Sequence, residues 1–302
     1  MVEAPQRRLV VQAQVVFDTR ADWSGALAAA RVWFETGWRE FGGEICAALE
    51  AQAAGHLDPT GPLGPLGASF LMGVAGRQGD DEVVVDYGER GMREFLLALG
   101  NSSHAYLYGS QLVALGERRG PVRGNYDETP YVLKLDAYRG DDREGRFLVL
   151  TLTGPGVFLL TTPTRQGAVL GFVRAVAELG VPVFGVVGPS SRSHHWTGLE
   201  RDLWTRPSET VARSLEVLRG YSWVTVVPDV LVERLGGVGK IAESGAFVRV
   251  EALRSGGVWL QATERFEDYQ LPQAARVFAV LRPVLLEGAF ASTFVERRKI
   301  VP

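Results

Sequence analysis

The sequence contains only one cysteine, Cys46, among its 302 residues. A lone thiol cannot form an internal disulfide, and such cysteine usage is typical of a reducing compartment. Cys46 lies in an apolar helical pattern, which favours a small buried side chain over a nucleophile. Long apolar runs are also missing, because the longest, 147–160, is broken by threonines and a Gly-Pro-Gly, whereas a membrane span needs about 20 apolar residues. With no signal-peptide pattern at the N-terminus, the sequence predicts a cytoplasmic protein without a membrane partner.

Motifs that mark metal, nucleotide and nucleophile sites are missing as well. There is no His-Glu-x-x-His, no paired Cys-x-x-Cys, no acidic calcium loop and no Gly-x-Ser-x-Gly. The glycine-rich segment 236–240 is not a phosphate loop, because Ile241 stands where Ser or Thr is required and we expect the segment to end a helix. His194 and His195 form the one histidine cluster, but neighbours in an extended segment point to opposite faces. We therefore expect no catalytic residue, no cofactor and no metal.

The composition is that of an ordinary globular protein. Hydrophobic residues make up 46% of the chain and charged residues 22%, enough apolar side chains for a sizeable core. Thirty-two basic and 35 acidic side chains leave a net charge of −3. A broad basic surface is therefore disfavoured, and we expect no direct contact with nucleic acid.

Periodicity predicts intermixed strands and helices. Helical spacing covers 23–51, with an interruption near Gly42 and Gly43, and also 90–99, 163–179, 207–218, 228–235 and 271–286. Strand patterns cover 8–17, 82–86, 105–115, 131–138, 147–153, 156–162, 181–187, 221–227, 246–253 and 257–262. Loops are expected over 55–67 and 118–130, and 190–203 reads as irregular. Hairpin-length connections favour an α+β fold with mixed, largely antiparallel sheets flanked by helices, in two related lobes, 1–125 and 126–302.

One family resemblance is carried by the C-terminal half. The stretch 220–237 reads Gly-Tyr-Ser-Trp-Val-Thr-Val-Val-Pro-Asp-Val-Leu-Val-Glu-Arg-Leu-Gly-Gly, and 256–263 reads Gly-Gly-Val-Trp-Leu-Gln-Ala-Thr. Together with the segments 183–188 and 275–283, these two stretches resemble the type VI secretion immunity proteins that are paired with VRR-NUC nuclease effectors. The resemblance covers 181–286 and departs at 55–67 and 264–268. Its motifs are structural, and we expect Trp223 and Trp259 to lie in the core.

The resemblance implies a protein without catalytic activity that binds and neutralises a cognate bacterial toxin, a secreted nuclease, by occluding its active or substrate-binding site. Against a nuclease, carboxylates can replace phosphates over the toxin's basic cleft, and aromatic side chains can anchor the complex. The candidate partner-binding residues are Asp80, Asp81, Glu82, Asp127, Glu128, Asp141, Asp142, Trp196, Trp204, Glu267, Asp268 and Tyr269.

Two other functions stay open from the sequence. The protein could be an intracellular enzyme that uses the loop of His194 and His195, or a regulatory subunit that binds a resident protein. Loss of an activity when both histidines are replaced would distinguish an enzyme from an immunity protein. Binding to a resident protein in cells that lack the toxin would distinguish a regulatory subunit.

Overall fold

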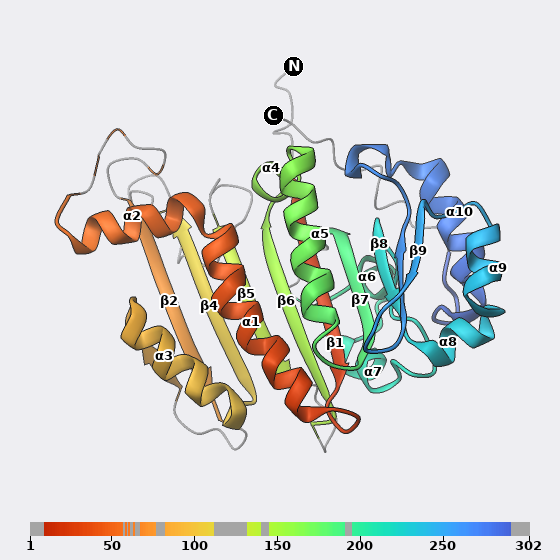
Figure 1. The fold of residues 1–302 in the computed structure, drawn as a ribbon, viewed down its shortest axis with the longest axis horizontal. Helices are drawn as coiled ribbons and strands as arrows, with labels where there is room; N and C mark the ends of the chain where they lie inside the picture. Colours follow the sequence, from red (N-terminus) through yellow and green to blue (C-terminus); the bar gives the residue numbers. More distant parts are fainter. Residues whose placement is uncertain are drawn as a thin grey trace.

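The computed structural model describes residues 9–56, 58, 60, 63, 67–76, 82–111, 132–139, 145–190 and 195–290. In these residues ten strands form one sheet, and every neighbouring pair is antiparallel, in the order β3-β2-β4-β5-β6-β1-β7-β8-β10-β9 (Figure 1). This confirms the predicted α+β class with antiparallel pairing flanked by helices. The strands are β1 (Val10–Asp18), β2 (Ala68–Ala75), β3 (Val83–Val85), β4 (His104–Gln111), β5 (Val132–Arg139), β6 (Phe147–Pro155), β7 (Pro182–Pro189), β8 (Val224–Val227), β9 (Arg249–Ala252) and β10 (Val258–Gln261).

The N-terminal strand β1 lies at the centre of the sheet, between β6 and β7. All nine of its residues are buried, as expected for a strand that is covered on both faces. Residues from the first and last parts of the chain therefore share one sheet. The predicted division at residue 125 falls in 112–131, outside the described residues, so the two lobes 1–125 and 126–302 stay a prediction.

Helices α1 (Trp23–Phe41), α2 (Gly43–Ala53), α3 (Glu89–Ala98) and α5 (Pro163–Ala177) lie over one face of the sheet (Figure 1). Asp22 caps α1 by accepting a hydrogen bond from the Gly25 amide, and Thr162 caps α5 in the same way. The predicted interruption between α1 and α2 is confirmed, since Gly43 adopts a positive φ of 39° there. No helix in the described part of the chain has the length and apolar character needed to cross a membrane.

Aromatic side chains join these helices to each other over the sheet. Trp33 and Phe34 of α1 are fully buried. The Trp33 ring lies 5.1 Å from that of Phe172 on α5, and the Phe34 ring lies 4.8 Å from that of Phe95 on α3. Each large apolar side chain buried in this way contributes about 1.5–3 kcal/mol to folding. The apolar core therefore sits between the helices and this face of the sheet.

The last third of the chain completes the sheet and packs short helices around it. Trp223 and Trp259 are 0% and 2% exposed, which confirms that both belong to the core. Gly236, with φ of 92°, ends α8 as expected for a helix-terminating glycine. The remaining helices are α4 (Gly156–Leu159), α6 (Gly198–Leu203), α7 (Pro207–Ala212), α8 (Asp229–Arg234), α9 (Gly237–Glu243) and α10 (Leu271–Leu281), and 3-10 turns span Leu99–Asn101, Phe266–Asp268 and Arg282–Val284.

Several local predictions were wrong. Segment 156–162 was predicted as a strand, but strand β6 ends at Pro155 and the segment begins with helix α4. Strand β2 was not predicted at all. Segment 190–203 contains helix α6, and the glycine-rich segment at 237 opens helix α9 directly after ending α8. Helix α7 ends at residue 212, whereas the prediction extended it to 218. The chain leaves the helix because the Leu218 amide donates to the Val284 carbonyl and not to a carbonyl one turn earlier.

Two glycines test how tightly the core is packed. A Cβ atom on Gly109 of β4 would lie 2.5 Å from the Trp38 ring and 2.8 Å from Ile45, whereas one on Gly171 of α5 would meet nothing within 4 Å. We expect Gly109→Ala to lower the free energy of unfolding by about 1–3 kcal/mol through overpacking. As the matched control, Gly171→Ala should raise it by about 0.5–1 kcal/mol, since alanine favours helix interiors. The urea unfolding midpoints of the two variants measure these changes in stability. A similar change in both variants would contradict the tight packing around Gly109.

Candidate functional site

Polar side chains alternate along four neighbouring strands on the face of the sheet opposite α1. The orientation follows from Leu135, which contacts α1 at Gly37, so that its neighbours on β5 point the other way. Strand pairing aligns these side chains in cross-strand rows. We name them the polar face: Gln12 and Gln14 on β1, His104, Tyr106 and Tyr108 on β4, Lys134, Asp136 and Tyr138 on β5, and Thr151 and Thr153 on β6.

The carboxylate of Asp136 lies at the centre of this face and is 1% exposed. The Tyr108 hydroxyl donates a hydrogen bond of 2.7 Å to its Oδ1. The Lys134 ammonium nitrogen is 3.3 Å from Oδ2, and His104 Nε2 is 3.5 Å from Oδ1. Two basic groups and one hydroxyl therefore surround a single buried negative charge.

These neighbours decide the protonation of Asp136. Burial alone would raise the pKa of this carboxyl group, but His104, the charges of Lys134 and His195, and the Tyr108 hydroxyl together hold the pKa below its ordinary value. Burial lowers the pKa of Lys134, and the nearby Asp136 opposes that change. Asp136 is consequently the ionised partner at neutral pH.

An aromatic row borders the cluster on β4. The rings of Tyr106 and Tyr108 are stacked with centroids 5.0 Å apart, and the Lys134 ammonium lies 4.5 Å from the Tyr108 ring centre. The Tyr106 hydroxyl occupies the space over Gly73, where a Cβ atom would lie 2.5 Å from it. Burial, and after it the carboxylate of Glu82, raises the pKa of Tyr106 well above its usual range. The Tyr106 phenol is therefore no acid at neutral pH.

A second buried charge pair lies beside β1. Arg219 and Glu200 are both fully buried, and Arg219 Nε donates to Glu200 Oε1 at 2.8 Å. Nη1 donates to Gln14 Oε1 at 2.9 Å, and Nη2 donates to the His195 carbonyl at 3.2 Å. Glu200 also accepts hydrogen bonds from the amide of Thr197 and from the hydroxyl of Thr210. Every nitrogen of the guanidinium is thus engaged.

Gln14 connects the two buried charge clusters. Its amide nitrogen donates to the Thr151 hydroxyl at 3.2 Å and to the His195 carbonyl at 3.3 Å, while its oxygen accepts from Arg219. Thr151 is the cross-strand partner of Asp136. The His195 ring packs against Tyr138, with ring centroids 4.2 Å apart. His195 therefore belongs to the polar face, and its carbonyl belongs to the Arg219 network.

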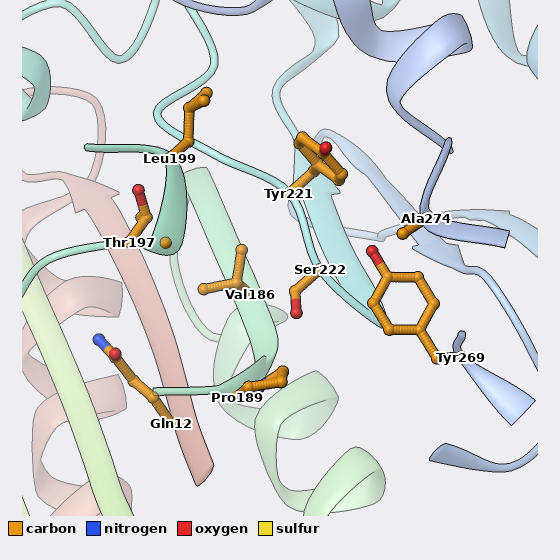
Figure 2. Close-up of a pocket in the computed structure, with 11 residues that line it drawn as sticks. Gln12, Val186, Pro189, Thr197, Leu199, Tyr221, Ser222, Tyr269 and Ala274 are labelled. Carbon is orange, nitrogen blue, oxygen red and sulfur yellow. The ribbon is translucent and has the colours of Figure 1, made fainter. Parts of the chain in front are cut away.

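A small pocket of about 40 Å³ lies next to this network, between β1, β7 and the start of α6. Figure 2 shows Tyr221, Ser222 and Tyr269 on one side of it, and Thr197 and Leu199 on the other. Such a volume holds water but no cofactor. The Thr197 hydroxyl already donates to the Arg219 carbonyl at 2.9 Å. Burial, and after it Tyr221, raises the pKa of Tyr269 well above 10, so this phenol stays neutral.

The described residues contain no group of three or more His, Cys, Asp or Glu side chains that could hold a metal ion. Cys46 is half-buried, and burial together with Glu50 raises its pKa to about 11. A thiol with that pKa is almost entirely protonated at neutral pH and is a poor nucleophile. The buried groups Arg219 and Glu200 are engaged with each other and with their neighbours.

The predicted partner-binding residues do not form one cluster among the described residues. Glu82 is exposed near Tyr106, and Trp204 is 86% exposed. Glu267 accepts a hydrogen bond from Gln166 at 3.0 Å, and Asp268 beside it is exposed. Trp196 is partly buried and Tyr269 is only 3% exposed, so the latter ring packs inside the molecule. The others lie outside the described residues, as does His194: Asp80, Asp81, Asp127, Glu128, Asp141 and Asp142.

The sequence reasoning missed the residues that build the buried clusters. Lys134 and Asp136 alternate with apolar residues in a strand, and Gln12 and Gln14 do the same in β1. That alternation is a readable sign of a sheet face that is not apolar. Arg219 carries no comparable sign, because its partner Gln14 lies 205 positions away.

Comparison with known proteins gives a likeness in fold. No protein-family model matches the chain, and no curated protein matches it either. Among solved structures, it is similar to the Pseudomonas aeruginosa T6SS protein PA0821, with a TM-score of 0.54 and 11% sequence identity. The match covers 98% of this chain and 84% of that one. At this identity the match shows a shared fold over nearly the whole chain.

The buried pair predicts an asymmetric response to mutation. Arg219→Met leaves Glu200 buried without its cation, and we expect a loss of about 3–5 kcal/mol in the free energy of unfolding. Arg213 and Glu216 form a pair at the surface, 55% and 68% exposed, so Arg213→Met should change stability by less than about 1 kcal/mol. Chemical denaturation measures both variants, and similar losses would contradict the role assigned to Arg219.

The lowered pKa of Asp136 predicts a pH dependence. The folded-state pKa lies below the ordinary value of 3.8, so the unfolded chain binds more protons as the pH falls through that value. The stability that Asp136 contributes is fully present above about pH 5 and is lost progressively below it. Asp136→Asn should therefore unfold more easily at pH 7 and show a shallower stability loss from pH 6 to pH 3. Parallel curves for the two proteins would contradict this assignment.

Proposed function

We propose that this protein is an immunity protein that binds a bacterial toxin delivered by a type VI secretion system and neutralises it without catalysis. The observation that carries the proposal is the likeness in fold to a T6SS protein across 98% of the chain. The stretches 220–237 and 256–263 independently resemble the immunity proteins of VRR-NUC nuclease effectors. That resemblance makes a nuclease the proposed toxin. We place the complex in the cytoplasm because the lone cysteine, Cys46, is typical of a reducing compartment.

The described structure is well suited to inhibition by binding. An inhibitor of this kind needs a rigid surface that is complementary to its target, because rigidity lowers the entropy lost on binding. The ten-stranded sheet and the fully engaged Arg219 network supply that rigidity. Neither requires a reactive group, and the proposal assigns none.

Co-expression with a secreted VRR-NUC nuclease effector from the same genome tests the proposal. Growth of a bacterial host that is stopped by the toxin alone should be restored, and the two proteins should co-elute as a complex in size-exclusion chromatography. Toxicity that persists while both proteins are well expressed would refute an immunity function.

A titration distinguishes binding from catalysis. If the protein inhibits by binding, toxin activity should fall linearly and vanish at a fixed stoichiometric ratio, and His195→Ala should inhibit as well as the unmodified protein. Inhibition by far less than one equivalent, growing with time and lost in His195→Ala, would instead favour an enzyme that uses the loop of His194 and His195.

A further inference from the structure

Helix α6 ends in an unusual backbone conformation. Trp204 has φ of 55° and ψ of 28°, and among the described residues it is the one non-glycine residue with positive φ. Its side chain is 86% exposed, more than any other large hydrophobic residue of the described chain. A large aromatic residue thus occupies a left-handed position and points into solvent.

Both properties of Trp204 are unfavourable for folding. A left-handed conformation is strained for a bulky L-residue, whereas glycine and asparagine adopt it at a helix end with little strain. An exposed ring recovers almost none of this through burial of apolar area. Strained residues of this kind concentrate at functional sites. The conformation therefore indicates a role for the indole ring that the isolated fold does not use.

The backbone that carries Trp204 is held firmly. Glu200, which pairs with Arg219, is part of the same short helix, and its carbonyl accepts a hydrogen bond of 3.0 Å from the Thr205 amide. The Trp204 amide donates to the Arg201 carbonyl at 3.2 Å. Because these hydrogen bonds hold the backbone at Trp204 and Thr205, the indole ring is attached to a rigid part of the chain.

Further side chains extend the surface around the ring. The chain near the C-terminal end of the described part passes beside α6, since a Cβ atom on Gly288 would lie 3.7 Å from Leu203. Phe290, two residues on, is 46% exposed. Arg206 is exposed, and no ion pair is found for it within the described residues. We name Leu203, Trp204 and Arg206 the Trp204 surface.

We propose that the Trp204 surface is where the toxin docks, with the indole ring entering an apolar pocket of the toxin and Arg206 meeting a carboxylate at the pocket's rim. This inference rests on the proposed immunity function. Tryptophan and arginine dominate the binding energy of many interfaces, and an anchor that is already fixed loses little entropy on binding. A lipid surface is disfavoured, because the partly exposed side chains of α6 next to the ring include the charged pair of Arg201 and Asp202 in place of an apolar face.

Two substitutions separate binding from folding. Trp204→Gly and Trp204→Asn both suit the left-handed backbone and both remove the indole ring. We expect each to weaken binding to the purified, catalytically silenced toxin at least 30-fold, which equals about 2 kcal/mol at 25 °C. We also expect a thermal midpoint that is unchanged or slightly raised, because the strain is relieved. Isothermal titration calorimetry and thermal unfolding give the two readouts, and Arg206→Glu should slow association at low salt.

The matched control is Leu97→Ala on α3, whose side chain is 70% exposed at the other end of the sheet (Figure 1). It should bind the toxin as tightly as the unmodified protein. Unchanged affinity in both Trp204 variants overturns the docking surface while leaving the immunity function standing, whereas failure of the unmodified protein to bind refutes both. A clear fall in the thermal midpoint of both variants, or binding to anionic vesicles that is lost with the ring, would also overturn the inference.

Discussion

Arg219 and Glu200 bury a full positive and a full negative charge in the same small volume, and much of the structure around β1 is arranged to make this tolerable. Removing such charges from water costs several kcal/mol each unless every donor and acceptor finds a partner. The partners come from strand β1, from the chain at residue 195, from the start of α6 and from α7. If one of these segments moved, a buried charge would lose its partner. The ion pair therefore fixes segments that are far apart in the sequence.

The sheet has two faces of different character, and the difference explains where binding is expected. One face is apolar and covered by α1, α2, α3 and α5, while the other carries the polar face, where buried Asp136 accepts a hydrogen bond from Tyr108 and buried Gln14 donates one to Thr151. Both sets of side chains are committed to the fold. A partner protein can bind more easily to exposed side chains outside the two faces of the sheet. Trp204 is such a group, because α6 ties it to the Arg219 network but leaves the ring in solvent.

Much of the fold could be predicted from local sequence signals, and the candidate site could not. Thr162 before Pro163, and Gly42 with Gly43, act on their immediate neighbours, so the ends of α5 and α1 could be read directly. Thr197 and Glu200 have the spacing of a capping box, which would have indicated α6. In contrast, nothing near Arg219 indicates that the Gln14 side-chain oxygen will accept a hydrogen bond from its guanidinium, and nothing near Trp204 indicates positive φ. Such features depend on packing between distant segments.

The central position of β1 has a consequence for how the protein is made. Strand β1 ends at Asp18, whereas its two neighbours, β6 and β7, begin at residues 147 and 182. Its backbone donors and acceptors therefore lack their full set of native partners until both of these later strands have been synthesised. Pairings this distant in sequence form slowly, and unpaired apolar strands invite aggregation in the meantime. A fragment that ends before residue 182 therefore cannot complete the middle of its own sheet.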